Sequence, residues 1–484
     1  MSQENETGWS ALLSGSNAVA SLALAGGVAL HAINVYVATT ILPSVVKDIG
    51  GIDYYAWNTT IFVAASILGS ALSAKLLGAA GPRGAYLVAA LVFAAGTLLC
   101  GFAPSMPALL AGRAVQGFGG GFLFALSYAM IRIVFPEALW PRAMGLISGM
   151  WGVATLVGPA IGGIFAEYGV WRAAFWSLAP IAILFAILAV VVLPAQSPDR
   201  NERTTVPILQ LALLLGAVLA VSAGSVSADP VYNLYGLGVA VVLIALLITV
   251  ESRARNRLLP RGSFRPSTAL GALFATMALL GVTVTGSEIF IPLFLQVLYE
   301  QTPLIAGYLA AIMSAGWTLG SIWSSGAEGK GIDRAIFAAP LFSFVGMAAL
   351  AVLFPLGGGH DWLLLAPICV AFAAIGLGVG IAWPHILTRI FKAAPEDEQD
   401  ITSASISTVT LFATAFGAAL AGMVANLGGL LDPGGLAGTA SASRWLFGLF
   451  ALAPLTCFIT VRQVARTCPV KGDRAAIVAE PGAA

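Results

Sequence analysis

Charged residues are scarce in this sequence. Asp, Glu, Lys and Arg make up 9% of the 484 residues, whereas hydrophobic residues make up 59%. A soluble domain carries about 25% charged residues, so the composition excludes a soluble globule and indicates an integral membrane protein. The net charge of +1 gives no electrostatic basis for binding nucleic acid.

Cysteine is also rare, and the chain has four: Cys100, Cys369, Cys457 and Cys468. None has a CxxC or other metal-ligand spacing, and the first three lie in apolar runs, so we interpret them as packing residues. A basic stretch at the start is missing too. Glu4 and Glu6 stand where a signal peptide would be basic, so we expect the first apolar run to remain as an anchor.

Signatures of enzymes and of ATP-driven pumps are absent from the sequence. We find no HExxH, no GxxxxGK[ST] loop and no paired acids within an apolar run. The loops between apolar runs are too short for a nucleotide-binding domain. We therefore expect no catalytic residues, no metal and no cofactor, and a protein that is not an enzyme.

Long apolar runs dominate the sequence instead. A helix needs about 20 apolar residues to cross about 30 Å of hydrocarbon. The runs are continuous and lack the ten-residue alternation of barrel strands, which predicts an all-α polytopic fold. Fourteen spans are predicted: 17–43, 54–77, 84–103, 106–134, 143–166, 171–194, 206–226, 232–250, 267–297, 303–326, 335–356, 361–389, 402–428 and 443–463.

The distribution of Lys and Arg predicts the orientation. With the N-terminus in the cytoplasm, 19 of these residues fall on the inner side and 3 on the outer side, as the positive-inside rule requires. We therefore expect a multi-pass protein of the cytoplasmic membrane with both termini in the cytoplasm. The basic loop 251–266 serves either as a topological anchor or as a site for anionic lipid.

The two ends of the chain resemble each other. "LGSALS" at 68–73 matches "LGSIWS" at 319–324 with an offset of 251. Three glycines repeat with an offset of 259, so that Gly117, Gly119 and Gly121 match Gly376, Gly378 and Gly380. Offsets that hold across several spans indicate an internal duplication.

The duplication predicts three parts. Residues 1–200 form an N-terminal six-helix bundle, 201–266 contain two inserted spans and the basic loop, and 267–484 form a C-terminal six-helix bundle with a cytoplasmic tail. Duplicated bundles with a binding site between them are the architecture of secondary transporters.

Two motifs resemble those of the major facilitator superfamily. "RAVQG", residues 113–117, matches the R-x-x-Q-G of the family's fourth span, and "GVATLVGPAIGG", residues 152–163, matches its fifth-span antiporter signature. Fourteen spans with a central extra pair are similar to the drug:proton antiporter branch. Two family features are incomplete. "AKLLGAAGPR" at 74–83 keeps little of the loop signature after the second span, and Asn34 stands where many members carry an acid.

The resemblance implies a fold of two six-helix bundles plus two central spans. It implies secondary active transport by alternating access, with proton-coupled efflux of lipophilic or cationic small molecules. The alternative is an importer or facilitator of a polar metabolite on the same fold. The expected partners are a small-molecule substrate, protons and the lipid bilayer, and we expect a monomer.

The antiporter motif also has a physical interpretation. Its glycines allow neighbouring helices to approach closely, and its proline removes a helical hydrogen bond and bends the helix. Such a helix either seals one side of a cavity or hinges, or it serves packing alone. The residues concerned are Gly152, Gly158, Pro159, Gly162 and Gly163.

Two charged residues, Arg113 and Glu288, lie well inside predicted spans. Each costs about 2.5–3.5 kcal/mol at mid-bilayer on insertion scales and so usually faces a cavity or a partner. At 100° per residue, Glu288 shares a narrow polar stripe with Thr285 and Gln296. A similar stripe on the first span contains His31 and Asn34. We expect Asn34, Gln116, Thr285 and Gln296 to be polar residues of the central cavity.

Each candidate coupling residue has an alternative role. Burial disfavours the charged form of a carboxyl group, so Glu288 either binds and releases protons or belongs to a buried structural pair. The resemblance assigns Arg113 to coupling, whereas the residue type alone fits structural hydrogen bonding. His31 either relays protons or is a neutral core histidine.

Overall fold

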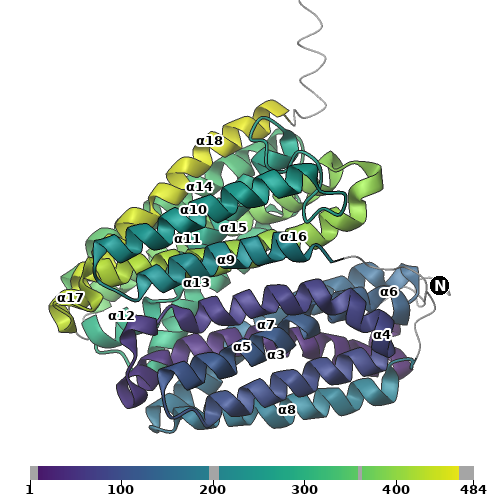
Figure 1. Cartoon of the computed structure of the whole chain (residues 1–484), viewed down its shortest axis with the longest axis horizontal. Coiled ribbons are helices and arrows are strands. Elements are labelled where there is room, and N and C mark those ends of the chain that lie inside the picture. Colours follow the sequence, from purple (N-terminus) through teal and green to yellow (C-terminus); the bar gives the residue numbers. More distant parts are fainter. Residues whose placement is uncertain (1–8, 196–205, 358–361, 468–484) are drawn as a thin grey trace, which may run out of the picture. The chain divides into compact units, whose positions relative to one another are not determined.

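A computed structural model describes residues 9–195, 206–357 and 362–467 (Figure 1). All regular elements in these ranges are helices, as the apolar runs predict. The chain divides into two compact units. The first comprises Met1–Ile208 with Gln301–Ala311, and the second comprises Leu209–Glu300 with Ile312–Ala484.

The first unit is built from long helices that bury a common apolar core. This core includes Leu24, Phe93, Leu126 and Ala186, all shielded from solvent. The elements are α2 (Trp9–Leu12), α3 (Gly15–Ile49), η1 (Ile52–Tyr54), α4 (Trp57–Gly101), α5 (Met106–Ala129), α6 (Ile131–Val134), η2 (Glu137–Leu139), α7 (Trp140–Glu167) and α8 (Trp171–Val192).

The second unit contains the remaining helices, and α13 begins in the first unit and continues into the second. The elements are α9 (Ile208–Ser225), α10 (Pro230–Arg253), α11 (Ala269–Glu288), α12 (Ile291–Leu298), α13 (Pro303–Ser324), α14 (Lys330–Leu353), η3 (Phe354–Leu356), α15 (Trp362–Ala393), η4 (Glu396–Glu398), α16 (Gln399–Ala425), η5 (Asn426–Leu430), α17 (Gly435–Phe450) and α18 (Leu452–Thr467).

Thirteen helical segments in the described ranges are long and apolar enough to span a membrane. The prediction of fourteen differs by one because the second and third predicted spans fall on a single segment, Ile52–Gly101. The helical geometry of that segment breaks at Gly81, which has φ 68° and precedes Pro82. Glycine adopts this left-handed conformation without a Cβ penalty, so one break accounts for the difference in count.

Helix packing confirms the internal repeat. In both units, glycines bring one helix against a backbone carbonyl of another, at positions related by the offsets 251 and 259. The pairs are Gly117 with Phe62 and Gly376 with Met313, Gly121 with Ser66 and Gly380 with Trp317, and Gly69 with Phe118 and Gly320 with Leu377. A Cβ on any of these glycines would overlap the facing helix, so close approach explains why glycine recurs.

The short connection after α5 and α6 also recurs after α15. Pro136 opens η2, and its carbonyl accepts a 2.9 Å hydrogen bond from the amide of Leu139. Pro395 opens η4 in the same way, with a 3.0 Å bond from the amide of Glu398. Both prolines have extended ψ values, which end the preceding helical path and set the direction of the next helix.

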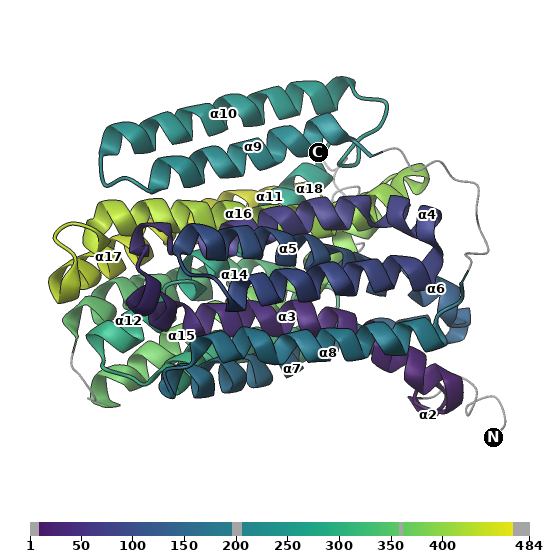
Figure 2. The ribbon, with the colours of Figure 1, turned by 60° about the horizontal axis from the view of Figure 1, so that its bottom comes forward.

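The inserted helices α9 and α10 pack beside α16 within the second unit, as Figure 2 shows. Small residues such as Ala217 and Ala240 meet Ala419 at this contact. The amide of Asn426 donates a 2.7 Å hydrogen bond to the carbonyl of Ser225 and anchors the end of α9.

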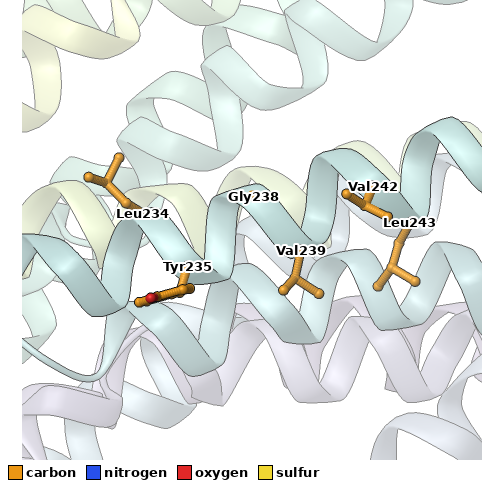
Figure 3. Close-up of a pocket in the computed structure, with 6 residues that line it drawn as sticks. All are labelled: Leu234, Tyr235, Gly238, Val239, Val242 and Leu243. Atoms are coloured by element: carbon orange, nitrogen blue, oxygen red, sulfur yellow. The ribbon is translucent and has the colours of Figure 1, made fainter.

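The opposite face of α10 is apolar and exposed. A shallow groove on this face is shown in Figure 3, lined by Leu234, Tyr235, Gly238, Val239, Val242 and Leu243. Its lining carries no charged group. Single apolar helix faces of this kind suit contact with lipid chains, and we interpret the groove as lipid-facing surface.

Candidate functional site

Glu288 lies where a membrane-spanning helix is interrupted. The predicted span 267–297 is divided into α11, which ends at Glu288, and α12, which begins at Ile291. The cause is Pro292, which has no amide hydrogen to donate to the carbonyl four residues earlier, that of Glu288. The prediction of one uninterrupted helix across this segment is therefore corrected, although 269–298 still counts as one span.

The Glu288 carboxyl group is partly shielded and has one polar partner on another helix. The Ser314 hydroxyl of α13 is hydrogen-bonded to it. Next to it, the hydroxyl of Ser287 donates to the carbonyls of its own helix, at 3.0 Å to Thr283 and 2.8 Å to Val284. Ser287 is thus satisfied locally, whereas the carboxyl group reaches across to α13.

The other members of the predicted polar stripe occupy different surroundings. Thr285 packs near Gly417 of α16. One turn earlier on α11, a Cβ on Gly281 would lie 3.0 Å from Ala413, so this face of α11 rests on α16. Gln296 is on α12, beyond the interruption, and its Nε2 has no hydrogen-bond partner among the described residues. The exposure of Thr285 and Gln296 to a water-filled cavity stays a prediction.

Arg113 is buried in the first unit, with 1% of its surface exposed. Its Nη1 donates a 2.6 Å hydrogen bond to Oε1 of Gln116, and its Nε donates a 3.2 Å bond to the carbonyl of Asn58. The guanidinium also lies 4.1 Å from the ring centre of Phe62, a cation–π contact. In the described structure its positive charge is therefore stabilised by neutral groups, and no carboxylate contacts it.

Gln116 connects this arginine to a third helix segment. Its Nε2 donates a 2.8 Å hydrogen bond to the hydroxyl of Thr97. That hydroxyl in turn donates to the carbonyl of Phe93 at 2.7 Å. The R-x-x-Q spacing places the two side chains on one face of α5, and the chain of bonds fixes the orientation of the guanidinium.

The two polar residues predicted on the first span lie on α3 within the first unit. His31 sits among three aromatic rings, with ring centres 5.2 Å from Phe62, 5.4 Å from Phe124 and 6.2 Å from Trp151. Asn34 is fully buried, yet neither atom of its side-chain amide has a hydrogen-bond partner among the described residues. An unpartnered buried amide is costly, and the contact of Asn34 with a central cavity stays a prediction.

The antiporter motif packs α7 against α3. A Cβ on Gly158 would overlap the Cβ of Tyr36, and one on Gly162 would lie 3.0 Å from the carbonyl of Val37. Gly163 meets Leu304 at the start of α13 instead. In contrast, a Cβ on Gly152 would meet nothing within 4 Å. Three of the motif's glycines thus serve close approach, whereas Gly152 does not.

Some residues with a place in these networks were not predicted. Ser314 and Asn58 belong to helices distant in sequence from the groups they contact, and no local pattern signals them. Asp333 forms an ion pair with Arg389, with 2.5 Å between Oδ1 and Nη2, joining the start of α14 to the end of α15. The only sequence signal for this pair is its charge at the ends of two apolar runs.

The described residues contain no group of three or more His, Cys, Asp or Glu that could hold a metal ion. The groups around Arg113 are an amide, a backbone carbonyl and an alcohol, which offer hydrogen bonds only. The Glu288 carboxyl group, in the second unit, is of a type that can also bind and release a proton.

Comparison with known proteins identifies relatives along most of the chain. The family model that matches, at residues 24–418, is described as Major Facilitator Superfamily. A "Probable multidrug-efflux transporter" of Mycobacterium tuberculosis is 36% identical over 444 residues, covering 89% of this chain and 91% of the relative. "Multidrug resistance protein 3" of Bacillus subtilis is 25% identical, covering 74% of this chain and 70% of the relative.

Solved structures show the same fold at low sequence identity. A crystal structure of the peptide transporter POT superposes with a TM-score of 0.67 at 16% identity, covering 93% of this chain and 96% of that one. The xylose transporter XylE of E. coli superposes with a TM-score of 0.59 at 16% identity, with the same coverage of both chains.

Proposed function

This chain belongs to the Major Facilitator Superfamily and is a multi-pass membrane transporter, and we propose that it exports lipophilic or cationic small molecules in exchange for protons. The relatives named above as multidrug-efflux and multidrug-resistance proteins support this substrate class. The antiporter motif in α7 supports exchange rather than uptake.

The observation that carries the proposal is the position of Glu288 beside an interrupted helix. Low-dielectric surroundings disfavour the charged form of a carboxyl group. Proton binding neutralises Glu288 and so lowers the free-energy cost of moving it when the transporter changes state. When the site opens to the cytoplasm, the proton leaves and the carboxylate attracts a cationic substrate. Proton and substrate then compete for one group, which couples their opposite movements.

Arg113 and His31 complete the proposed coupling machinery in the first unit. Among the described residues Arg113 has no carboxylate partner, so it brings a fixed, unpaired positive charge to the first unit. His31, enclosed by aromatic rings, stays neutral in this scheme and positions the α3 segment that carries Asn34. Asn34, Thr285 and Gln296 offer polar contacts to substrate along the pathway, whereas Gln116 is engaged in holding the Arg113 guanidinium.

The antiporter motif supplies the mechanical part of the proposal. Gly158 and Gly162 hold α7 against α3, and Pro159 gives α7 a weak point in its hydrogen-bond ladder. Sliding or bending at this contact would seal one side of the pathway while the other opens. The proposed setting is the cytoplasmic membrane, with a monomeric protein, two six-helix bundles at 1–200 and 267–484, the inserted pair between them, and both termini in the cytoplasm.

Transport in inverted membrane vesicles tests the direction and the driving force. Acidifying the vesicle interior reproduces the outer side of the cell, so an exporter accumulates a cationic dye inside. A protonophore should abolish this accumulation. If the dye instead leaves acidified vesicles, the protein is an importer and the proposal fails.

A further inference from the structure

A second groove lies between the first turns of α11 and the last turns of α18, at the opposite end of α11 from Glu288. Its volume is about 510 Å³. The segment that leads into α11 and its first turns contribute Pro266, Ser267, Ala272 and Ala275, and α18 contributes Ile459, Thr460, Arg462, Gln463 and Arg466. Both helices belong to the second unit.

The floor of this groove is held by side-chain hydrogen bonds. The hydroxyls of Thr276 and Thr460 are 2.8 Å apart and join the two helices. Nearer the ends, Nε2 of Gln463 donates a 3.4 Å bond to the carbonyl of Ser267. These bonds fix the spacing between the helices, so the groove is a built feature of the fold.

The lining changes from apolar to basic along the groove. Ile459 is 69% exposed and faces outward beside Ala272 and Ala275. Arg462 and Arg466 follow, four residues apart and so on one face of α18. In the predicted orientation, α18 ends in the cytoplasm, which places the apolar part in the hydrocarbon and the two arginines at the inner headgroup layer.

Among the residues that the structure describes, the two guanidinium groups have no acidic partner. Neither Arg462 nor Arg466 forms an ion pair within the described structure, and the segments 262–277 and 452–467 contain no Asp or Glu. Helix α14 also packs against α18 and carries Asp333, but the Asp333 carboxylate forms an ion pair with Arg389. The groove therefore has unpaired positive charge at one end and an apolar lining along the rest.

We propose that this groove binds an anionic phospholipid of the inner leaflet. Guanidinium forks match phosphate oxygens in a bidentate manner, and an acyl chain would lie along Ile459 and Ala275. Two unpaired arginines favour a headgroup with net negative charge, because a choline ammonium group would be repelled. This inference is independent of the proposed transport function.

Lipid counting by native mass spectrometry tests the site. The full-length protein in detergent is titrated with phosphatidylglycerol, and in parallel with phosphatidylcholine. The expected result is one tightly retained phosphatidylglycerol and weaker retention of phosphatidylcholine. Arg462→Gln with Arg466→Gln should weaken retention about tenfold or more, from the usual contribution of each basic residue near an anionic surface.

Two further variants separate a specific site from general attraction. Ala275→Trp fills the apolar part without changing charge and should also release the lipid. Lys75→Gln with Lys392→Gln removes two exposed basic residues outside both the groove and the basic loop 251–266, and should leave retention unchanged. Equal losses in the arginine pair and the lysine pair, or full retention in Ala275→Trp, would overturn the proposal.

Discussion

Nη1 of Arg113 lies 2.6 Å from Oε1 of Gln116, one turn further along the same helix. The buried cation is thus held by a neutral amide, a backbone carbonyl and an aromatic ring. Removing one acceptor from a buried charged donor is more costly than removing a neutral hydrogen bond. This relationship makes Gln116 the support on which the position of the guanidinium depends.

Gln116→Leu is therefore expected to destabilise the protein. The substitution keeps the volume but removes the acceptor, at a cost of about 1.5–3 kcal/mol for a hydrogen bond to a charged group. Thermal unfolding in detergent should show a lowered midpoint. Gln116→Glu restores an acceptor for Nη1, so its midpoint should stay closer to that of the unmodified protein; equal loss in both variants would contradict this account.

Gly158→Leu is expected to abolish transport while the protein still inserts. A side chain at Gly158 overlaps Tyr36 and separates α7 from α3. Gly152→Leu is the matched control from the same motif, because a Cβ at Gly152 meets nothing within 4 Å. Efflux measured for equal amounts of membrane-inserted protein should be lost in the first variant and kept in the second. Normal efflux by Gly158→Leu would show that the close contact has no mechanical role.

Alkaline phosphatase fusions are expected to report both predicted sides of the membrane. The enzyme is active only outside the cytoplasm, so a fusion after Val464 should be silent and one after Gly169 should be active. An active fusion at Val464 would mean that the number of spans is odd. The kink at Gly81 would then fail to separate two spans.

Pro292→Ala is expected to change the helix at Glu288. The new amide can donate to the Glu288 carbonyl, so α11 and α12 would join and the carboxyl group would move away from Ser314. Because a helix-interrupting proline is removed, thermal stability should not fall, whereas efflux should. Unchanged efflux would show that the interruption does not position the carboxyl group.

The membrane spans could be predicted from the sequence because the thickness of the membrane sets the length of an apolar helix. It found the repeat because glycines at close contacts are constrained by backbone approach and therefore recur in both halves. The interruption within 267–297 was not predicted, because hydropathy does not report which backbone hydrogen bonds can form. A signal was nevertheless present in the sequence. Pro292 lies four residues after Glu288 and has no amide hydrogen to donate to the Glu288 carbonyl.

The partners of the buried polar groups were not predicted. The link between Arg113 and Gln116 could have been, because their spacing of three residues places both side chains on one face of a helix. The contacts of Arg113 with Asn58 and of Glu288 with Ser314 depend on which helices pack together. Such tertiary contacts have no local pattern in the sequence, so only the structure supplies them.

The central claim is that Glu288 carries the proton that drives export. Glu288→Gln tests it most directly, because glutamine keeps the shape and the hydrogen bond to Ser314 but cannot titrate. The measurement is dye accumulation in inverted vesicles across a range of interior acidities, with Ser314→Ala as a neighbouring variant that leaves the carboxyl group in place. The account predicts that Glu288→Gln loses accumulation at every acidity while dye binding survives, and that Ser314→Ala still accumulates dye. Uphill accumulation by Glu288→Gln with unchanged pH dependence would contradict the claim and place the coupling proton elsewhere.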